Sequence, residues 1–506
     1  MGYFQNTLSY IIQFRWFPIK EDKMNKKLLL ITLLSLLAIL SCPKYRSTFP
    51  PPVQKSEDII VFENVNLVPM TDDKIVKNQT VLIKGSRIIK IGPSKTIAMP
   101  ENSKHIDGTG AFLMPGLADM HMHTRTDWNE WFSDWPVSPF YLYLANGVTT
   151  IRSFNPHGDT FGYVLRWREK INSGQLIGPT IYTSGPTIYG PVNNPKKIVL
   201  EQKALGFDFI KLYSFLSKEE FHEAMITAKQ EDMYTAGHIP FQVGLEGILS
   251  EGMDEIAHIE ELSFELVDFD RNKGLTGREW MPYVIKTAYQ QFKPYLGLNM
   301  EELDERFGDL VPSVATKVHS ANVPVCTTLF LDEVIVEKLY EPKKFLSKPE
   351  NKYLPRKYRA AFRQGREKHQ MQFRGGEDFA PFKRTIDRIL LKYLKEAEVF
   401  FVLGTDAGTG WMGLVPGFSI HEELRILTEN GFTPYEAIKT GTVNAAIVVD
   451  KMSGNGDLGT IEIGKRADLI LVEDNPLEDV ANIKKILGVM ASGRWYDKTV
   501  LQKFLD

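Results

Sequence analysis

Gly-Leu-Ala-Asp-Met-His-Met-His, residues 116–123, is the stretch from which the organisation of this chain can be inferred. Side chains alternate between the two faces of a strand, so His121 and His123 point to the same side. Two imidazoles on one side can hold one metal ion, although an isolated pair of this kind is as often a polar strand end. The choice depends on whether further ligands follow at the ends of later strands.

The region after this stretch alternates between apolar, strand-like runs and helical patterns such as residues 218–231 and 420–430. Repeated β-α units favour an α/β fold with a (β/α)8 TIM-type barrel over an open sheet. The predicted barrel strands cover residues 112–121, 147–153, 180–184, 207–213, 233–238, 253–258, 323–329 and 399–405.

Polar residues gather at the carboxyl ends of these predicted strands, where barrels of this type carry their active sites. They are four histidines, one aspartate and one lysine: His121, His123, Lys211, His238, His258 and Asp406. Imidazole and carboxylate are the expected ligands of Zn²⁺ or a similar divalent ion. Lys211 lies in the apolar run Phe-Ile-Lys-Leu, where burial favours the neutral amine. A neutral amine can react with CO₂ to give a carbamate, which can bridge two metals.

Both flanks of the predicted barrel carry short alternating strands joined by tight turns. They predict one small β-sandwich domain built from residues 57–112 and 457–500. The metal-dependent barrel is predicted to cover residues 113–450, with helical insertions at about 262–320 and 331–397. Connections of that length are usually functional lids or subdomains.

The N-terminal region has the pattern of an exported protein. Residues 24–42 combine a basic start, a short apolar run and Cys42, as a signal peptide does. The ending Ile-Leu-Ser-Cys resembles a bacterial lipobox, which implies that Cys42 is lipidated; the alternative is a plain signal peptide with an incidental cysteine. We expect residues 1–42 to be an extension plus lipoprotein signal peptide, with translation starting at Met24, and residues 43–56 to be a tether. The protein would then be anchored to a bacterial membrane, facing the periplasm or the cell exterior.

The composition is that of an ordinary globular protein. The 506 residues are 43% apolar and 24% charged, with a formal charge of −3. This balance gives no reason to expect nucleic acid as a partner. We expect a small-molecule substrate, and an oligomer is possible from the sequence.

Taken together, the motifs resemble the amidohydrolase superfamily in its binuclear form with a carboxylated lysine, among its prolidase-like and imidazolonepropionase-related members. The motifs that carry the resemblance are residues 114–123, 147–150, 419–424, 431–437 and 464–469. The resemblance implies that His121, His123 and Asp406 bind the more buried metal. It also implies that His238 and His258 bind the more exposed metal and that a carbamate on Lys211 bridges the two ions.

This resemblance implies a hydrolase that cleaves the amide (C–N) bond of a dipeptide or an N-acyl amino acid, and not of a polymeric protein. A metal-bridging hydroxide would attack the carbonyl, and Asp406 would carry its proton to the leaving nitrogen. Tyr213, two residues after Lys211, could donate to the oxyanion or could simply be packed. Hydrolysis of a cyclic amide or a lactone is the alternative reaction. An inactive substrate-binding lipoprotein is disfavoured because every expected ligand position is filled.

Other candidates have weaker support. His157, Trp128 and Trp131 lie in loops after the first two predicted barrel strands and could contact substrate, although a solvated loop and ordinary aromatic packing explain them as well. We expect His421 to be structural. The remaining histidines lie away from the strand ends and are expected at the surface: His105, His222, His319 and His369.

Overall fold

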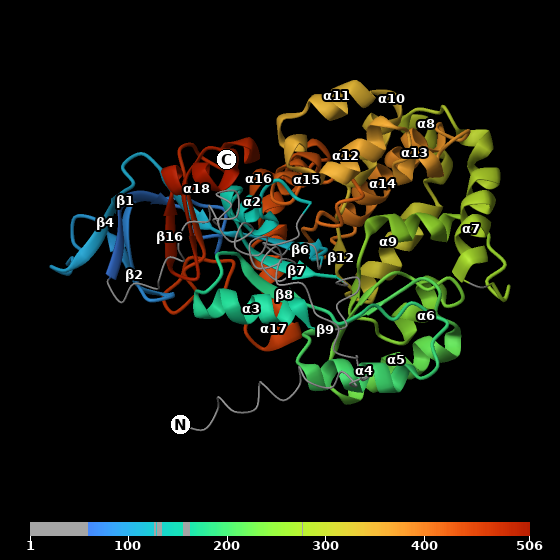
Figure 1. The fold of residues 1–506 in the computed structure, drawn as a ribbon, viewed down its shortest axis with the longest axis horizontal. Helices are drawn as coiled ribbons and strands as arrows, with labels where there is room; N and C mark the ends of the chain where they lie inside the picture. Colours follow the sequence, from blue (N-terminus) through green and yellow to red (C-terminus); the bar gives the residue numbers. More distant parts are fainter. Residues whose placement is uncertain (1–58, 126–127, 129–133, 155–161, 276) are drawn as a thin grey trace, which may run out of the picture. The chain divides into compact units, whose positions relative to one another are not determined.

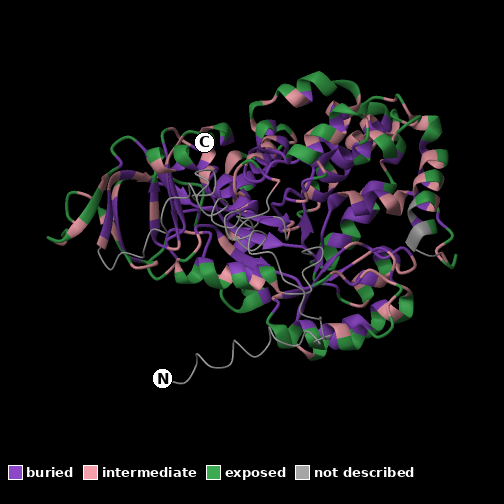
Figure 2. Cartoon of the chain, viewed as in Figure 1, coloured by how far each residue is buried: buried purple, intermediate pink, exposed green. Residues whose placement is uncertain are grey.

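The computed structural model describes residues 59–125, 128, 134–154, 162–275 and 277–506. Its centre is a set of short parallel strands, buried along their length (Figures 1 and 2). They form a three-stranded sheet, β6-β7-β8, and a five-stranded sheet, β13-β12-β11-β10-β9. The strands are β6 (Leu117–Met122), β7 (Val148–Ser153), β8 (Thr180–Thr183), β9 (Phe209–Leu212), β10 (Tyr234–Gly237), β11 (Glu255–Ile256), β12 (Val325–Cys326) and β13 (Phe401–Val402).

Backbone hydrogen bonds join the two parallel sheets at both of their edges. Between β8 and β9, the N–H of Asp208 donates to the carbonyl of Thr183 at 2.9 Å. Between β6 and the end of β13, the N–H of Met120 donates to the carbonyl of Leu403 at 2.8 Å. The strands therefore follow one another around a ring, which confirms the predicted TIM-type barrel.

Helices follow most of the barrel strands and turn one apolar face inward (Figure 2). The predicted helix at 218–231 is α5 (Lys218–Gln230), and the one at 420–430 is α15 (Phe418–Glu429). Helix α5 begins at a capping box in which Ser217 and Glu220 satisfy each other's backbone N–H. Over the described residues, no helix is both long and apolar enough to cross a membrane. The other outer helices are α2 (Pro139–Ala145), α3 (Tyr163–Ser173), α4 (Pro195–Leu205), α6 (Gly244–Ser250), α16 (Pro434–Thr440) and α17 (Val443–Ser453).

Two helical insertions extend the connections after β11 and β12, drawn in yellow-green to orange in Figure 1. The first contains η3 (Ile259–Leu266), α7 (Gly277–Phe292), η4 (Lys293–Tyr295), α8 (Met300–Phe307) and α9 (Leu310–Ser320). The second contains α10 (Phe330–Tyr340), α11 (Pro342–Ser347), η5 (Pro349–Tyr353), α12 (Arg356–Arg363), α13 (Lys368–Gln372) and α14 (Phe379–Glu396). Helix α14 packs against both α9 and η3, and the rings of Phe292 and Phe382 lie 4.8 Å apart. The insertions therefore form one helical layer.

A third sheet combines strands from both flanks of the barrel, in the order β16-β15-β14-β5-β1-β2-β3, with β4 also paired to β1. Its strands are β1 (Ile59–Leu67), β2 (Val76–Lys84), β3 (Arg87–Pro93), β4 (Ser103–Asp107), β5 (Phe112–Pro115), β14 (Leu469–Val472), β15 (Ile486–Ala491) and β16 (Arg494–Asp497). Strand β5 pairs with β1 on one side and β14 on the other. The rings of Phe62 in β1 and Trp495 in β16 meet edge to face at 5.0 Å, so the sheet curls over an apolar core. Two further elements, η6 (Val480–Lys484) and the terminal helix α18 (Lys498–Leu505), complete this region.

The predicted strand at 112–121 is in fact two strands that belong to different sheets. Strand β5 ends at Pro115 and β6 begins at Leu117, so the chain crosses from the curled sheet to the barrel at Gly116. The N–H of Gly116 donates to the carbonyl of Asp468 at 2.8 Å, whereas Leu117 donates to Gly147 at 3.0 Å. Strands β5 and β6 are both apolar. The hydrophobic pattern therefore does not show where the chain changes from one sheet to the other.

We expect Gly116→Ala to destabilise the protein. An added Cβ would lie 2.1 Å from Oγ1 and 2.5 Å from Cγ2 of Thr149, a buried β-branched side chain with little freedom to rotate. Overpacking of this kind costs about 1–3 kcal/mol of unfolding free energy. Thermal and urea unfolding would measure the loss. Gly274→Ala is the matched control, because nothing lies within 4 Å of its Cβ position. Equal stability of the two variants would contradict the prediction.

Candidate metal centre

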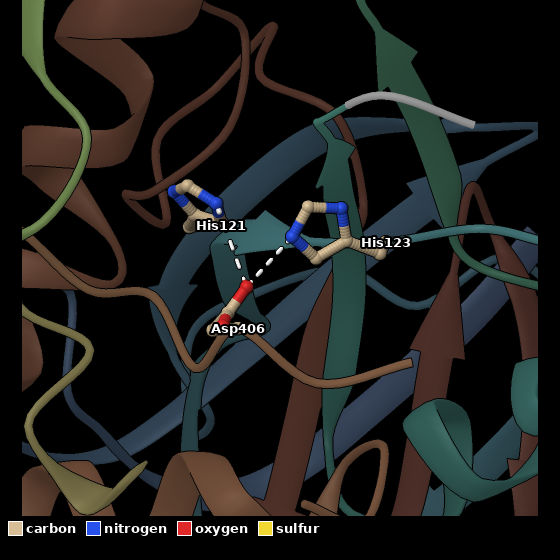
Figure 3. A group of neighbouring side chains, drawn as sticks. All are labelled: His121, His123 and Asp406. Atoms are coloured by element: carbon tan, nitrogen blue, oxygen red, sulfur yellow. Dashed lines mark hydrogen bonds and ion pairs between the residues drawn. The ribbon is translucent and has the colours of Figure 1, made fainter. Parts of the chain in front are cut away.

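Three of the predicted ligands meet where β6 ends and the chain leaves β13 (Figure 3). His123 Nε2 lies 2.6 Å from Asp406 Oδ1, and His121 Nε2 lies 3.7 Å from the same oxygen. One ligand atom from each side chain falls within 4.8 Å of the other two. The three side chains are therefore close enough to share one cation.

The backbone of β6 sets the position of Asp406. The N–H groups of Thr405 and Asp406 both donate to the carbonyl of His121, at 3.0 and 2.7 Å. Asp406 itself has a φ of 57°, in the left-handed region that few residues other than glycine adopt. Conformations of this kind persist where the surroundings hold them, and here they turn the carboxylate toward the two histidines.

Asp119 supports this corner, although the sequence analysis assigned it no role. Its carboxylate accepts hydrogen bonds from Thr405 Oγ1 at 2.6 Å, from the Thr405 N–H at 3.1 Å and from the His121 N–H at 3.3 Å. Complete burial raises the pKa of Asp119 to about 7. One signal was available in the sequence, because Asp119 is a charged residue two positions before His121 in an otherwise apolar strand.

His238 and His258 extend the group of imidazoles. The ring of His258 lies 4.2 Å from that of His121 and 4.8 Å from that of His238. His238 Nδ1 is 2.5 Å from Oε1 of Glu261, and His258 Nδ1 is 3.2 Å from Oγ1 of Thr328. Such contacts orient each ring and leave Nε2 as the ligand atom. Sequence reasoning missed Glu261, which lies on η3, beyond the strand ends.

Burial keeps these imidazoles in the state that binds metal. It lowers the pKa of His121 and His238 well below the usual value and that of His258 to about 3, and the neighbouring histidines and Lys211 add to the effect. A neutral imidazole has a lone pair to give to a cation.

Lys211 is 2% exposed on β9, and its Nζ lies 4.7 Å from the centre of the Phe154 ring. The ring of His121 stacks on the same Phe154 ring, with the two ring centres 3.9 Å apart. Burial lowers the pKa of Lys211 to about 8 against the opposing pull of Asp406 and Glu261. A larger fraction of this amine is therefore neutral near pH 7 than for an ordinary lysine.

Several buried nitrogens at this site have no hydrogen-bond partner among the described residues: His121 Nδ1, His121 Nε2, His123 Nδ1 and Lys211 Nζ. Buried polar atoms in folded proteins are normally partnered. Unpartnered imidazole nitrogens beside a carboxylate and a lysine amine are a donor set that fits a divalent cation.

The other predicted site residues have different surroundings. Tyr213 faces the cavity, with its ring 4.2 Å from His238 and 4.6 Å from Tyr189. Trp128 is 4% exposed and packs against Phe140 and Trp135, with ring centres 5.3 and 6.0 Å away. His157, Trp131 and Cys42 lie outside the described residues.

Among the other histidines, the surface prediction is wrong for His369, which is 4% exposed, whereas His105, His222 and His319 are exposed as expected. His369 lies on α13 and is buried by contacts with the other insertion helices. The sequence pattern does not predict those contacts. His421 is also buried, at 4% exposure.

One cavity of about 650 Å³ opens onto this cluster. Its inner wall contains metal-centre residues, including His123, Lys211, His238, His258 and Asp406. Its outer walls come from the two helical insertions. A bound molecule could therefore reach the metal centre while contacting both insertions.

Comparisons with known proteins agree with this architecture. The sequence model of the Amidohydrolase family matches residues 378–496, which include Asp406. Ochratoxinase from Aspergillus niger is 24% identical over 441 residues, covering 81% of this chain and 80% of that protein. A solved Xaa-Pro dipeptidase with methionine in its active site is 20% identical, with a TM-score of 0.59 over 87% of this chain and 100% of its own. The solved A. niger ochratoxinase is 18% identical, with a TM-score of 0.57 over 87% of this chain and 96% of its own.

The structural likenesses establish the fold, and the family match covers the end of the barrel together with strands β14 to β16. Residues 378–496 therefore resemble the Amidohydrolase family, and the fold is that of the solved dipeptidase and ochratoxinase.

Proposed function

We propose that this protein is a metal-dependent hydrolase that cleaves the amide bond of a dipeptide or an N-acyl amino acid. The observation that carries the proposal is the cluster of Asp406, His121 and His123, with unpartnered imidazole nitrogens, beside one cavity that His123 and Asp406 line. Relatives named as an ochratoxinase and a Xaa-Pro dipeptidase support hydrolysis of an amide bond. The dipeptidase also supports the substrate class proposed here.

The donor atoms divide into two groups. His121, His123 and Asp406 would hold one divalent cation, and His238 and His258 would hold a second; nitrogen and carboxylate donors suit Zn²⁺. Lys211 would contact both ions after its neutral amine adds to CO₂ and loses a proton, giving a carbamate. When bound, the two cations would supply Lewis acidity that activates water and polarises the substrate carbonyl.

Asp406 is suited to move the proton. Burial favours its neutral form, but the neighbouring His123 and its hydrogen bond outweigh burial and lower the pKa of Asp406 below the usual value. The group is therefore a carboxylate at neutral pH, which can accept a proton from the attacking water and deliver it to the leaving nitrogen.

Tyr213 is suited to donate a hydrogen bond. Burial raises the pKa of its phenol well above the usual value, so the hydroxyl keeps its proton. It lines the cavity beside His238. From there it would donate to the oxygen that gains negative charge when the carbonyl is attacked.

Asp406→Asn should lower kcat by about 10²–10⁴-fold, because the amide cannot accept the proton. The measurement is turnover on a panel of dipeptides, N-acyl amino acids, cyclic amides and lactones, with bound metal quantified in the same samples. Asp309→Asn, at an exposed site, is the control. Turnover at the wild-type rate in Asp406→Asn would rule out the mechanism, and cleavage of only the cyclic substrates would favour the alternative reaction.

Lys211→Ala should lose most of the bound metal, because the bridging group disappears. A short carboxylic acid such as propionate should restore part of the metal content by occupying the space of the carbamate. Metal analysis with and without the acid tests this, and Lys229→Ala, at an exposed position of α5, is the control. Full metal content in Lys211→Ala without added acid would contradict the bridging role.

We also propose that the protein is exported and that Cys42 carries a lipid anchor, since residues 24–42 have the sequence pattern described above. In a bacterial host, the wild-type protein should fractionate with membranes and release into detergent. Cys42→Ser should lack the lipid mass. An unmodified Cys42 in the wild-type protein would refute the anchor.

A further inference from the structure

The part of the cavity that the two insertions wall is lined by apolar side chains with charged and polar ones among them. Helix α7 supplies one wall, and the helices of the second insertion supply the other. The main apolar lining residues are Trp280, Tyr289, Phe292, Ile335, Phe373 and Phe379. We call this part of the cavity the outer chamber. A total volume of about 650 Å³ lies in the range of sites that enclose drug-sized molecules, which are larger than a simple dipeptide.

Several polar side chains of the second insertion line the cavity: Lys368, His369, Gln372, Arg374 and Lys383. His369 is the one among them that a fully buried lysine holds in place. Lys338 on α10 is 1% exposed, and its ammonium contacts Glu367 Oε1 at 3.0 Å, the carbonyl of Met412 at 2.7 Å and Nδ1 of His369. An ammonium group has three donors and no acceptor. Nδ1 of His369 must therefore accept, and the proton of the neutral ring lies on Nε2.

His369 is held in this form. Burial lowers its pKa well below the usual value, and Lys338, Lys368 and Lys383 act in the same direction, so the ring stays neutral. His369 lines the cavity, and its Nε2 has no hydrogen-bond partner within the part of the chain that the structure describes. This N–H faces the cavity, so an acceptor on a bound molecule could take the place of the water that solvates it.

We infer that the outer chamber is a subsite for a bulky aromatic or branched apolar group of the substrate, and that His369 donates from Nε2 to a hydrogen-bond acceptor on that group. The inference rests on the proposed function in one respect: the group in the outer chamber is joined to the rest of the substrate by the amide bond that the protein would cleave. The chamber and its fixed donor rest on the cavity and on the Lys338 contacts alone.

Lys338 is the positioning residue for this donor. Its ammonium fixes the tautomer of His369 and also binds the carbonyl of Met412 in the loop that follows Asp406. The same cation therefore links the wall of the outer chamber to the loop that leaves the metal centre.

Gly376 allows the chamber to be filled without straining the backbone. Gly376 lines the cavity, has no positive φ, and an added Cβ would meet only Tyr289 Cε2, at 3.7 Å. Gly376→Phe should therefore place a ring in the chamber. Gly274→Phe is the matched control, because Gly274 lies outside the cavity with nothing within 4 Å of its Cβ position.

The probes are carboxylic acids that need no turnover: 6-acetyl-2-naphthoate, the acceptor-free 6-isopropyl-2-naphthoate and acetate. Their Kd values for the metal-loaded protein are measured by titration calorimetry. Gly376→Phe should weaken 6-acetyl-2-naphthoate at least about tenfold, while acetate binding stays the same and Gly274→Phe has no effect. Equal naphthoate affinity in Gly376→Phe and the wild-type protein would overturn the subsite.

Two substitutions of His369 test the donor. His369→Gln keeps an N–H near the position of Nε2, whereas His369→Asn keeps an acceptor for Lys338 but its shorter side chain does not bring an N–H to that position. The wild-type protein and His369→Gln should prefer the acetyl over the isopropyl probe by about three- to tenfold, and His369→Asn should lose this preference. Equal binding of the two probes to the wild-type protein, or the same preference in His369→Asn, would overturn the role of His369.

Binding and turnover separate the two proposals. Suppose that the wild-type protein binds the naphthoate, that Gly376→Phe abolishes this binding, and that no amide is hydrolysed. This result would support the subsite and refute the proposed function. Suppose instead that the protein hydrolyses small amides equally well with and without Gly376→Phe, and that it does not bind the naphthoate. This result would support the proposed function and refute the subsite.

Discussion

The hydrogen bonds between β6 and residues 403–407 are the contact on which the rest of this structure depends. They close the barrel, because they join the first barrel strand to the last. The same bonds place the carboxylate of Asp406 beside His121 and His123. Asp119 reinforces them through Thr405. The bonds that close the barrel therefore also set the positions of three of the proposed ligands.

Lys211 differs from Lys338 and Lys383 in the partners of its amine. Lys383 contacts three carboxylates, those of Glu260, Asp332 and Asp387, at 2.6–2.8 Å. Lys338 has three acceptors of its own. Lys211 is about as deeply buried as Lys338 but has no hydrogen-bond partner among the described residues. A charged amine without a partner is costly to bury, which is why the pKa of Lys211 falls to about 8.

The sequence was sufficient for the barrel and for its ligand candidates, because both follow from local regularities. Strands alternate with helices, and polar residues stand where apolar strands end. The supporting residues Asp119 and Glu261 could not be assigned in this way, since their roles come from partners that are distant in sequence. The burial of His369 was missed for the same reason: helices of the two insertions cover it, and a helical pattern does not say which helix will pack on which. The predicted strand at 112–121 ran across Gly116 without a break because both neighbouring strands are apolar.

The curled sheet also has a consequence for biosynthesis. Strand β5 lies between β1, which is made early, and β14, which is made after the whole barrel. The barrel itself closes only when residues 403–407 are available to β6. A growing chain on the ribosome can therefore form helices and local hairpins, but neither sheet system can reach its final pairing until residues 403–407 and 469–472 have been synthesised. Strands β5 and β6 each wait for a partner that is made much later than they are.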